Sequence, residues 1–215
     1  MALTVGLLND GDRLPPEVEL ATQLGVSTVA LRQALTVLRD KGILVTRRGR
    51  GGGSFVQDGS AYNLADVEMQ LRSRSVEELR DLGDACASAA GSAARLATMR
   101  ALPEDLERLD RFAGEFARAE QSVACRRADS RFHIELGVAA QSPRLTLLMV
   151  QMQGEMAPLL WAPGTEMPTE AAQEHDLIVE AIRSRDAEAA QRYAAEHCER
   201  EARLLIARHL KLAAA

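Results

Sequence analysis

The stretch GDRLPPEVELATQLGVSTVALRQALTVLRDKGILVTRRGRGGGSFV, residues 11–56, decides the fold of the N-terminal part of the chain. Two prolines precede an apolar-periodic segment over Glu17–Leu24, and Gly25 follows it. Proline suits the first turn of a helix, and glycine commonly ends one. Ser27 is a preferred N-cap for a second helix over Thr28–Asp40. The pattern predicts two short helices joined by a tight turn.

A β-hairpin is predicted directly after the second helix. Ile43–Thr46 and Ser54–Gln57 have strand character, and a tip rich in arginine and glycine separates them. Helix, turn, helix and hairpin in this order are typical of a winged helix-turn-helix, whose second helix enters the DNA major groove. A structural helical hairpin would explain the two helices, and a flexible basic loop would explain the arginine- and glycine-rich tip. The order and spacing of all these elements together favour DNA binding. The candidate DNA contacts are Thr28, Arg32, Gln33, Arg47, Arg48 and Arg50.

The charge distribution agrees with a nucleic-acid partner, although the whole chain has a net charge of −5. Residues 28–50 contain six basic side chains and one acidic side chain, whereas residues 61–215 have a net charge of −6. A local basic patch on an acidic protein can bind phosphates while the remainder keeps the protein soluble.

The quoted stretch resembles the winged-helix domain of the GntR family of bacterial regulators, and the resemblance covers nearly all of residues 11–56. Arg32 matches a position that contacts operator DNA in the family. Val18 and Thr28 stand where the family usually has two further DNA-contacting arginines. The family motif also has a whole helix before this stretch, and only Met1–Leu8 precedes it here. We therefore expect a DNA-binding domain over residues 1–57 with a truncated first helix.

The remaining residues predict a linker over 58–72 and an all-helical domain over 73–213. Apolar residues make up 47% of the chain and aromatic residues only 3%, and alanine and leucine dominate the apolar set, which favours helices. We expect a mainly α protein whose C-terminal domain is a helical bundle. The expected helices are Val76–Arg100, Glu104–Glu120, Ala124–Ala140, Arg144–Leu160, Thr169–Arg183 and Ala187–Leu210. No run of eighteen apolar residues and no secretion signal is present, so we expect a cytoplasmic protein with three reduced cysteines and no membrane partner.

Histidines are the informative residues of the helical part, because the chain has only four. Asp129 and His133 are four residues apart and therefore share one face of a helix. His175 and His197 lie eleven residues before and after Asp186 in a predicted turn, so antiparallel helices would place them at the same level. Three imidazoles and one carboxylate suit zinc or another divalent transition metal. On spacing alone, hydrogen-bonded core histidines and an ordinary surface aspartate explain the pattern better than a metal site does.

Three segments of the helical part resemble the FCD ligand-binding domain of the FadR-type branch of the GntR family. They are ADSRFHIELGVAAQSP (residues 128–143), EHDLIVEAIRSRDAEAA (174–190) and YAAEHCER (193–200). Metal-binding members of that branch have ligands at the positions of Asp129, His133, His175 and His197. The resemblance implies zinc as the preferred ion, with nickel or manganese as alternatives, beside a bound organic acid. Arg80 matches a common family arginine that could pair with that acid, although a surface pair with Asp84 is an equal alternative.

The function predicted from these features is a ligand-responsive transcription regulator. We expect a homodimer that binds double-stranded operator DNA as a repressor and releases it when a small carboxylate effector binds. A metal-dependent hydrolase or oxygenase using the same Asp/His cluster is the alternative from another class. Glu174 or Glu135 could serve as its base, but neither has HExxH spacing. A regulator with a structural metal, or with none, is the third hypothesis.

Overall fold

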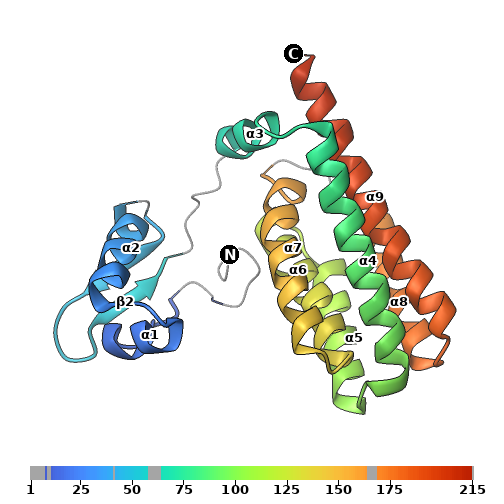
Figure 1. The fold of residues 1–215 in the computed structure, drawn as a ribbon, viewed down its shortest axis with the longest axis horizontal. Helices are drawn as coiled ribbons and strands as arrows, with labels where there is room; N and C mark the ends of the chain where they lie inside the picture. The colour runs from blue at the N-terminus through green and yellow to red at the C-terminus, as the bar shows by residue number, and fades with distance from the viewer. Residues whose placement is uncertain (1–7, 9–10, 41, 58–63, 164–168, 215) are drawn as a thin grey trace. The chain divides into compact units, whose positions relative to one another are not determined.

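The computed structural model describes residues 8, 11–40, 42–57, 64–163 and 169–214 (Figure 1). They fall into two compact units, one within Leu7–Asn63 and the other within Leu64–Ala215. None of the helices in these ranges is both long enough and apolar enough to span a bilayer. The predicted truncation of a first helix concerns Met1–Leu8, most of which lies outside the described residues.

The N-terminal unit begins with the predicted pair of helices, α1 (Glu17–Leu24) and α2 (Thr28–Asp40). Gly25 ends α1 in the left-handed conformation, with φ of 66°, which glycine adopts without the steric cost of a Cβ. The Ser27 side chain caps α2 by accepting a hydrogen bond of 3.1 Å from the Ala30 amide. Leu31 and Leu35 are buried on the inner face of α2. The predicted helix-turn-helix is therefore confirmed.

The predicted hairpin consists of β1 (Leu44–Arg47) and β2 (Gly53–Val56) in antiparallel register. Leu44 pairs with Val56 at one end, and Arg47 pairs with Gly53 next to the turn. On its other side, β2 forms a bridge through Phe55 to Arg13, so the segment before α1 ties the wing to the rest of the unit.

The second unit is an α-helical bundle, as predicted. Ser75 and Glu78 form a capping box that starts the long helix α4. Apart from α3, the other helices begin and end within a few residues of the expected positions. The helices are α3 (Leu64–Arg72), α4 (Val76–Arg100), α5 (Pro103–Ala117), α6 (Ser122–Ala139), α7 (Pro143–Leu160), α8 (Thr169–Arg183) and α9 (Ala187–Ala213). The three cysteines are buried and free, in agreement with reduced thiols.

One prediction about this unit is wrong. Residues 64–72 were expected to belong to a linker, but they form the helix α3. Val67 and Leu71 are fully buried, and α3 packs against α7 and α9. Their spacing of four residues places both side chains on one helix face. The other linker residues, 58–63, lie outside the described residues.

The bundle is organised around the close contact of α4 with α9, which run side by side (Figure 1). Small residues permit this approach: a methyl group at Gly83 would overlap the Cβ of Ala202. Helix α6 contacts α4, α5 and α7, while α8 contacts α5 and α9. Buried side chains of α6, α8 and α9 converge in the bundle interior, where they form the polar cluster described below.

Candidate functional site

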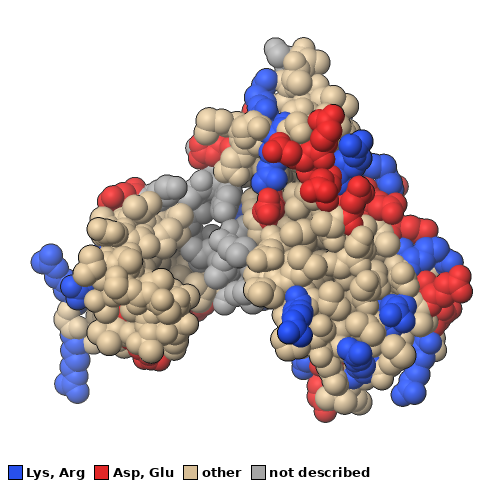
Figure 2. Space-filling view, viewed as in Figure 1, with Lys and Arg blue, Asp and Glu red and all other residues tan. Residues whose placement is uncertain are grey.

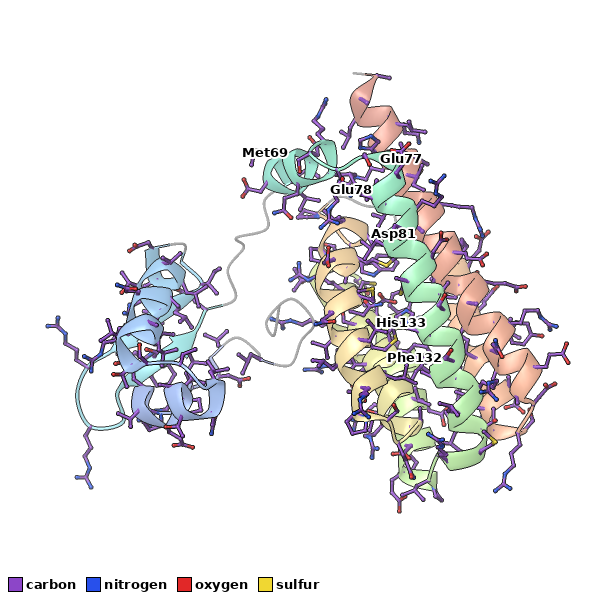
Figure 3. All side chains as sticks on the ribbon, in the orientation of Figure 1. Met69, Glu77, Glu78, Asp81, Phe132 and His133 are labelled. Atoms are coloured by element: carbon purple, nitrogen blue, oxygen red, sulfur yellow. The ribbon has the colours of Figure 1, made fainter. Side chains whose placement is uncertain are left out.

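Four predicted ligand residues converge in the bundle interior. Asp129 and His133 lie on α6, His175 on α8 and His197 on α9, and each is at most 1% exposed. The Nε2 atom of His197 lies 3.3 Å from Nε2 of His175 and 3.2 Å from Nε2 of His133. Asp129 Oδ1 lies 3.4 Å from Nε2 of His175. Figure 3 shows His133 among the helices of the bundle, next to Phe132. The structure thus brings all four side chains together.

The turn between α8 and α9 explains why two of the histidines meet. Arg185 has a positive φ of 61°, and the Asp186 side chain caps α9 by accepting a 3.0 Å hydrogen bond from the Ala189 amide. This tight connection returns the chain antiparallel to α8. His175 and His197, equally distant from the turn, consequently lie at the same level, as their spacing predicted.

The donor set fits a divalent metal ion. Nitrogen and oxygen ligands about 2.0–2.2 Å from one ion are roughly 2.9–3.5 Å apart, close to the separations between these imidazole and carboxylate atoms. Asp129 Oδ1 and the Nδ1 atoms of His133 and His175 are buried and have no hydrogen-bond partner among the residues that the structure describes. Unsatisfied polar atoms of this kind are costly inside a protein. A cation among the facing atoms would compensate the carboxylate and accept the lone pairs of the imidazole Nε2 atoms.

The protonation states match those that a metal site needs. Burial lowers the pKa of His133 to about 3 and also lowers that of His175. Burial by itself would raise the pKa of Asp129, but the close approach of His175 and the other two imidazoles lowers it to about 2. Neutral imidazoles and an ionised carboxylate are the forms that bind metals.

Glu174 and Arg200 orient the imidazole of His197. The Nδ1–H group of His197 donates to Oε2 of Glu174 at 2.6 Å, and Arg200 Nε donates to Oε1 of Glu174 at 2.7 Å. Burial opposes ionisation of Glu174, yet these hydrogen bonds lower its pKa to about 2. An ionised carboxylate can only accept, so Nδ1 of His197 carries a proton and Nε2 is directed toward His133 and His175.

Aromatic side chains enclose the cluster. The Trp161 indole donates a 2.9 Å hydrogen bond to Asp129 Oδ2, which leaves Oδ1 for the histidines. The Phe132 ring stacks on His175, with 4.0 Å between ring centroids. Phe116 contacts both Trp161 and His175. Trp161 was missed from sequence because it lies just beyond the end of α7, where only a chain break was expected.

Glu201 is a further residue that the sequence did not reveal. It lies on α9 one turn after His197, is 1% exposed and approaches His197 Nε2 to 3.4 Å. Burial, and secondly the neighbouring Asp129, raise its pKa well above the usual range. The signal available in the sequence was its spacing of four residues from His197, which glutamates on solvated helices commonly share.

Other predicted residues lie elsewhere. Arg80 is exposed on α4, in contrast to the buried cluster, so its role in effector binding stays a prediction. Glu135 accepts a 2.8 Å hydrogen bond from Arg108, and Glu174 is held by His197 and Arg200. Both candidate bases of the metalloenzyme alternative are therefore engaged in ion pairs.

The candidate DNA contacts lie on α2 and the wing. Thr28 is half-buried and the other five residues are exposed. Arg32 forms a 2.6 Å ion pair with Glu17 of α1, and the Arg47 guanidinium lies 4.6 Å from the centre of the Phe55 ring. Basic side chains project from the end of this unit where the β1–β2 turn lies (Figure 2).

Comparisons with known proteins agree with the assignment of both units, the helix-turn-helix unit and the helical bundle. The family of bacterial regulatory proteins called gntR matches residues 1–54, and the FCD domain matches residues 81–200. The fold resembles that of a GntR-family transcriptional regulator from Pseudomonas syringae pv. tomato str. DC3000, with a TM-score of 0.57 and 19% identity over 100% of this chain and 84% of that one. A helix-turn-helix joined to an FCD-type helical domain is thereby established.

The chain belongs to the GntR family and is a DNA-binding transcription regulator with an FCD domain. It is 41% identical over 203 residues to the putative HTH-type transcriptional regulator RmpR of Mycobacterium gastri, covering 93% of this chain and 74% of that protein. It is 35% identical over 145 residues to the putative L-lactate dehydrogenase operon regulatory protein of Escherichia coli (strain K12), covering 66% of this chain and 54% of that protein. The family and these relatives are transcription regulators rather than enzymes, which leaves the metalloenzyme alternative without support.

Proposed function

We propose that this chain is a ligand-responsive repressor that binds operator DNA as a homodimer and releases it when a small organic acid binds beside a metal ion in the helical domain. The carrying observation is the convergence of Asp129 with His133, His175 and His197 in the FCD-type half of a DNA-binding regulator. A buried set of three imidazoles and one carboxylate has the composition of a metal centre.

DNA recognition is assigned to α2 and the wing. Thr28, Arg32 and Gln33 reach base edges or phosphates from α2 in the major groove. Arg47, Arg48 and Arg50 contact phosphates or the minor groove. Support comes from the exposure of the five longer side chains and from the basic charge of this region. A two-fold dimer would present two copies of α2 to a pseudo-palindromic operator.

The metal is assigned to the four converging side chains. Zinc is the preferred ion, with nickel and manganese as alternatives, because all three accept imidazole together with carboxylate ligands. When bound, the ion supplies a positive charge that can hold and orient a carboxylate. Glu174 positions His197 for this role, and Trp161 positions Asp129.

A small carboxylate is proposed as the effector. One relative is named for an L-lactate dehydrogenase operon, and a cation is a natural anchor for an acid of that kind. Binding can release the operator only if the acid has a higher affinity for the non-binding arrangement of the dimer.

Operator binding tests the proposal. The full-length, metal-loaded chain is titrated against a labelled duplex from upstream of its own gene, with a scrambled duplex as control, by fluorescence anisotropy at fixed salt. We expect tighter binding to the upstream duplex and weaker binding after addition of an effective acid from a panel that includes L-lactate, pyruvate and acetate. Equal affinity for the two duplexes would overturn the regulatory proposal, because phosphate contacts alone do not discriminate sequence.

A further inference from the structure

The Glu201 carboxylate has no satisfactory partner within the described residues. Both of its oxygens are buried, and neither has a hydrogen-bond partner in the described part of the chain. Two atoms of the candidate metal centre face the carboxylate: Oε1 lies 3.4 Å from Nε2 of His197, and Oε2 lies 3.8 Å from Nε2 of His133. The Cys198 thiol also lies within 4.8 Å of the carboxylate. A buried carboxylate without a donor or a cation is strongly unfavourable. The charged form of Glu201 therefore needs a positive group, and the space between its oxygens and the two imidazole Nε2 atoms is where a cation would lie.

The same two imidazole nitrogens also face Asp129 or His175. His133 Nε2 lies 3.8 Å from Asp129 Oδ1, and His197 Nε2 lies 3.3 Å from His175 Nε2. An ion bound by the three Nε2 atoms and Asp129 would consequently lie next to the Glu201 carboxylate. The helix geometry supports this placement, because the interval of four residues puts Glu201 on the same face of α9 as His197.

We propose that Glu201 is a fifth ligand of the metal centre, which then consists of three imidazoles and two carboxylates. This inference rests on the metal centre proposed above and extends it. Two carboxylates balance the charge of a divalent ion, so the buried centre as a whole is neutral. An ion with six positions would keep only one position open for an exogenous donor. The effector would then bind the ion through a single oxygen atom rather than as a two-point chelate.

The test compares Glu201→Gln with the wild-type chain and with Glu199→Gln. Glu199 lies on the same helix, but its side chain is 50% exposed, so its substitution removes the same charge outside the cluster. Metal-free, full-length proteins are titrated with nickel by calorimetry, and their cobalt(II) complexes are examined by absorption spectroscopy. The cobalt spectrum reports coordination number, because ligand-field bands are weak in six-coordinate sites and intense in four-coordinate sites.

We expect Glu201→Gln to bind nickel at least about tenfold more weakly than wild type, since even outer-shell partners of metal ligands contribute 10–100-fold. Its cobalt bands should change in position and intensity, while Glu199→Gln should match wild type in both measurements. Unchanged nickel affinity and an unchanged cobalt spectrum in Glu201→Gln would overturn the assignment of Glu201 alone. A wild-type chain that binds neither ion would overturn the proposed metal centre together with it.

Discussion

Asp129 illustrates how hydrogen bonds prepare a side chain for a ligand role. Its Oδ2 accepts from the Trp161 indole at 2.9 Å, and its Oδ1 remains directed at His175 at 3.4 Å. The two oxygens are therefore not equivalent. A hydrogen bond from a residue that does not itself bind the ion, such as Trp161, fixes the orientation of the ligand side chain before the ion binds. Less conformational entropy is then lost on metal binding.

Glu174 allows a direct test of this principle at His197. Replacement by glutamine keeps the size of the side chain but removes the charge that holds the proton on Nδ1 of His197. We expect Glu174→Gln to weaken metal binding by about 10–100-fold, measured by competition with a chromophoric chelator. Glu170→Gln, a substitution at an exposed position of the same helix, should leave the affinity unchanged. Equal affinities of the two variants would contradict a positioning role for Glu174.

In the DNA-binding unit, Val18 and Thr28 occupy positions where arginine is expected to strengthen DNA binding. Val18 is 68% exposed on α1, and Thr28 is the first residue of α2, so arginine fits at both positions without repacking the core. We expect the double substitution Val18→Arg and Thr28→Arg to increase affinity for a typical GntR-family operator, because each arginine adds a phosphate or base contact. A titration at fixed salt that shows no gain would argue against the assigned DNA-binding surface.

At the scale of elements, the contact of α4 with α9 depends on glycine. We expect Gly83→Ala to destabilise the bundle by about 1–3 kcal/mol, because its methyl group overlaps Ala202 and forces the helices apart. Gly114→Ala in α5 is the matched control, since its nearest neighbour is the flexible end of the Arg118 side chain.

Alanine also favours helix over glycine by roughly 1 kcal/mol, so Gly114→Ala should be neutral or stabilising. Urea denaturation of both variants measures the difference. Similar unfolding free energies for the two variants would show that the close approach of α4 and α9 tolerates a methyl group.

Local signals explain which elements could be predicted from sequence. Prolines, glycines and the 3.6-residue period placed both short helices, the wing and six long helices, and the turn at Asp186 aligned His175 with His197. Helix α3 was missed because its two buried residues, Val67 and Leu71, follow a polar segment that is typical of linkers. The 3.6-residue apolar period and the prolines and glycines at helix ends indicate local structure, whereas the burial of such a short helix depends on tertiary contacts.

The candidate site was predictable only in part for the same reason. Asp129 and His133 share one helix turn, which sequence spacing can reveal. Trp161 and Arg200 act through partners 32 and 26 residues away. Glu201 differs from a surface glutamate only by its burial, which depends on how α9 packs against the other helices. Long-range pairing of this kind has no signature in a single sequence.

For the whole molecule, the metal centre links ligand binding to stability. An ion that binds only the folded chain stabilises it by about 4 kcal/mol when its free concentration is a thousand times its dissociation constant. We therefore expect EDTA to lower the melting temperature of the metal-loaded chain by an amount on the order of 10 °C. The variant His133→Ala should show little response to EDTA, and an equal response of both proteins would contradict binding at this cluster.

The most direct measurement for the central claim, that α6, α8 and α9 together bind a divalent ion, is native mass spectrometry of the full chain. Wild-type protein and the double variant His133→Ala, His197→Ala are incubated separately with zinc, nickel and manganese and then desalted. The account predicts one retained ion per wild-type chain for at least one metal, and none in the double variant. A wild-type chain with only its metal-free mass under all three conditions, or a double variant that retains an ion equally well, would contradict it.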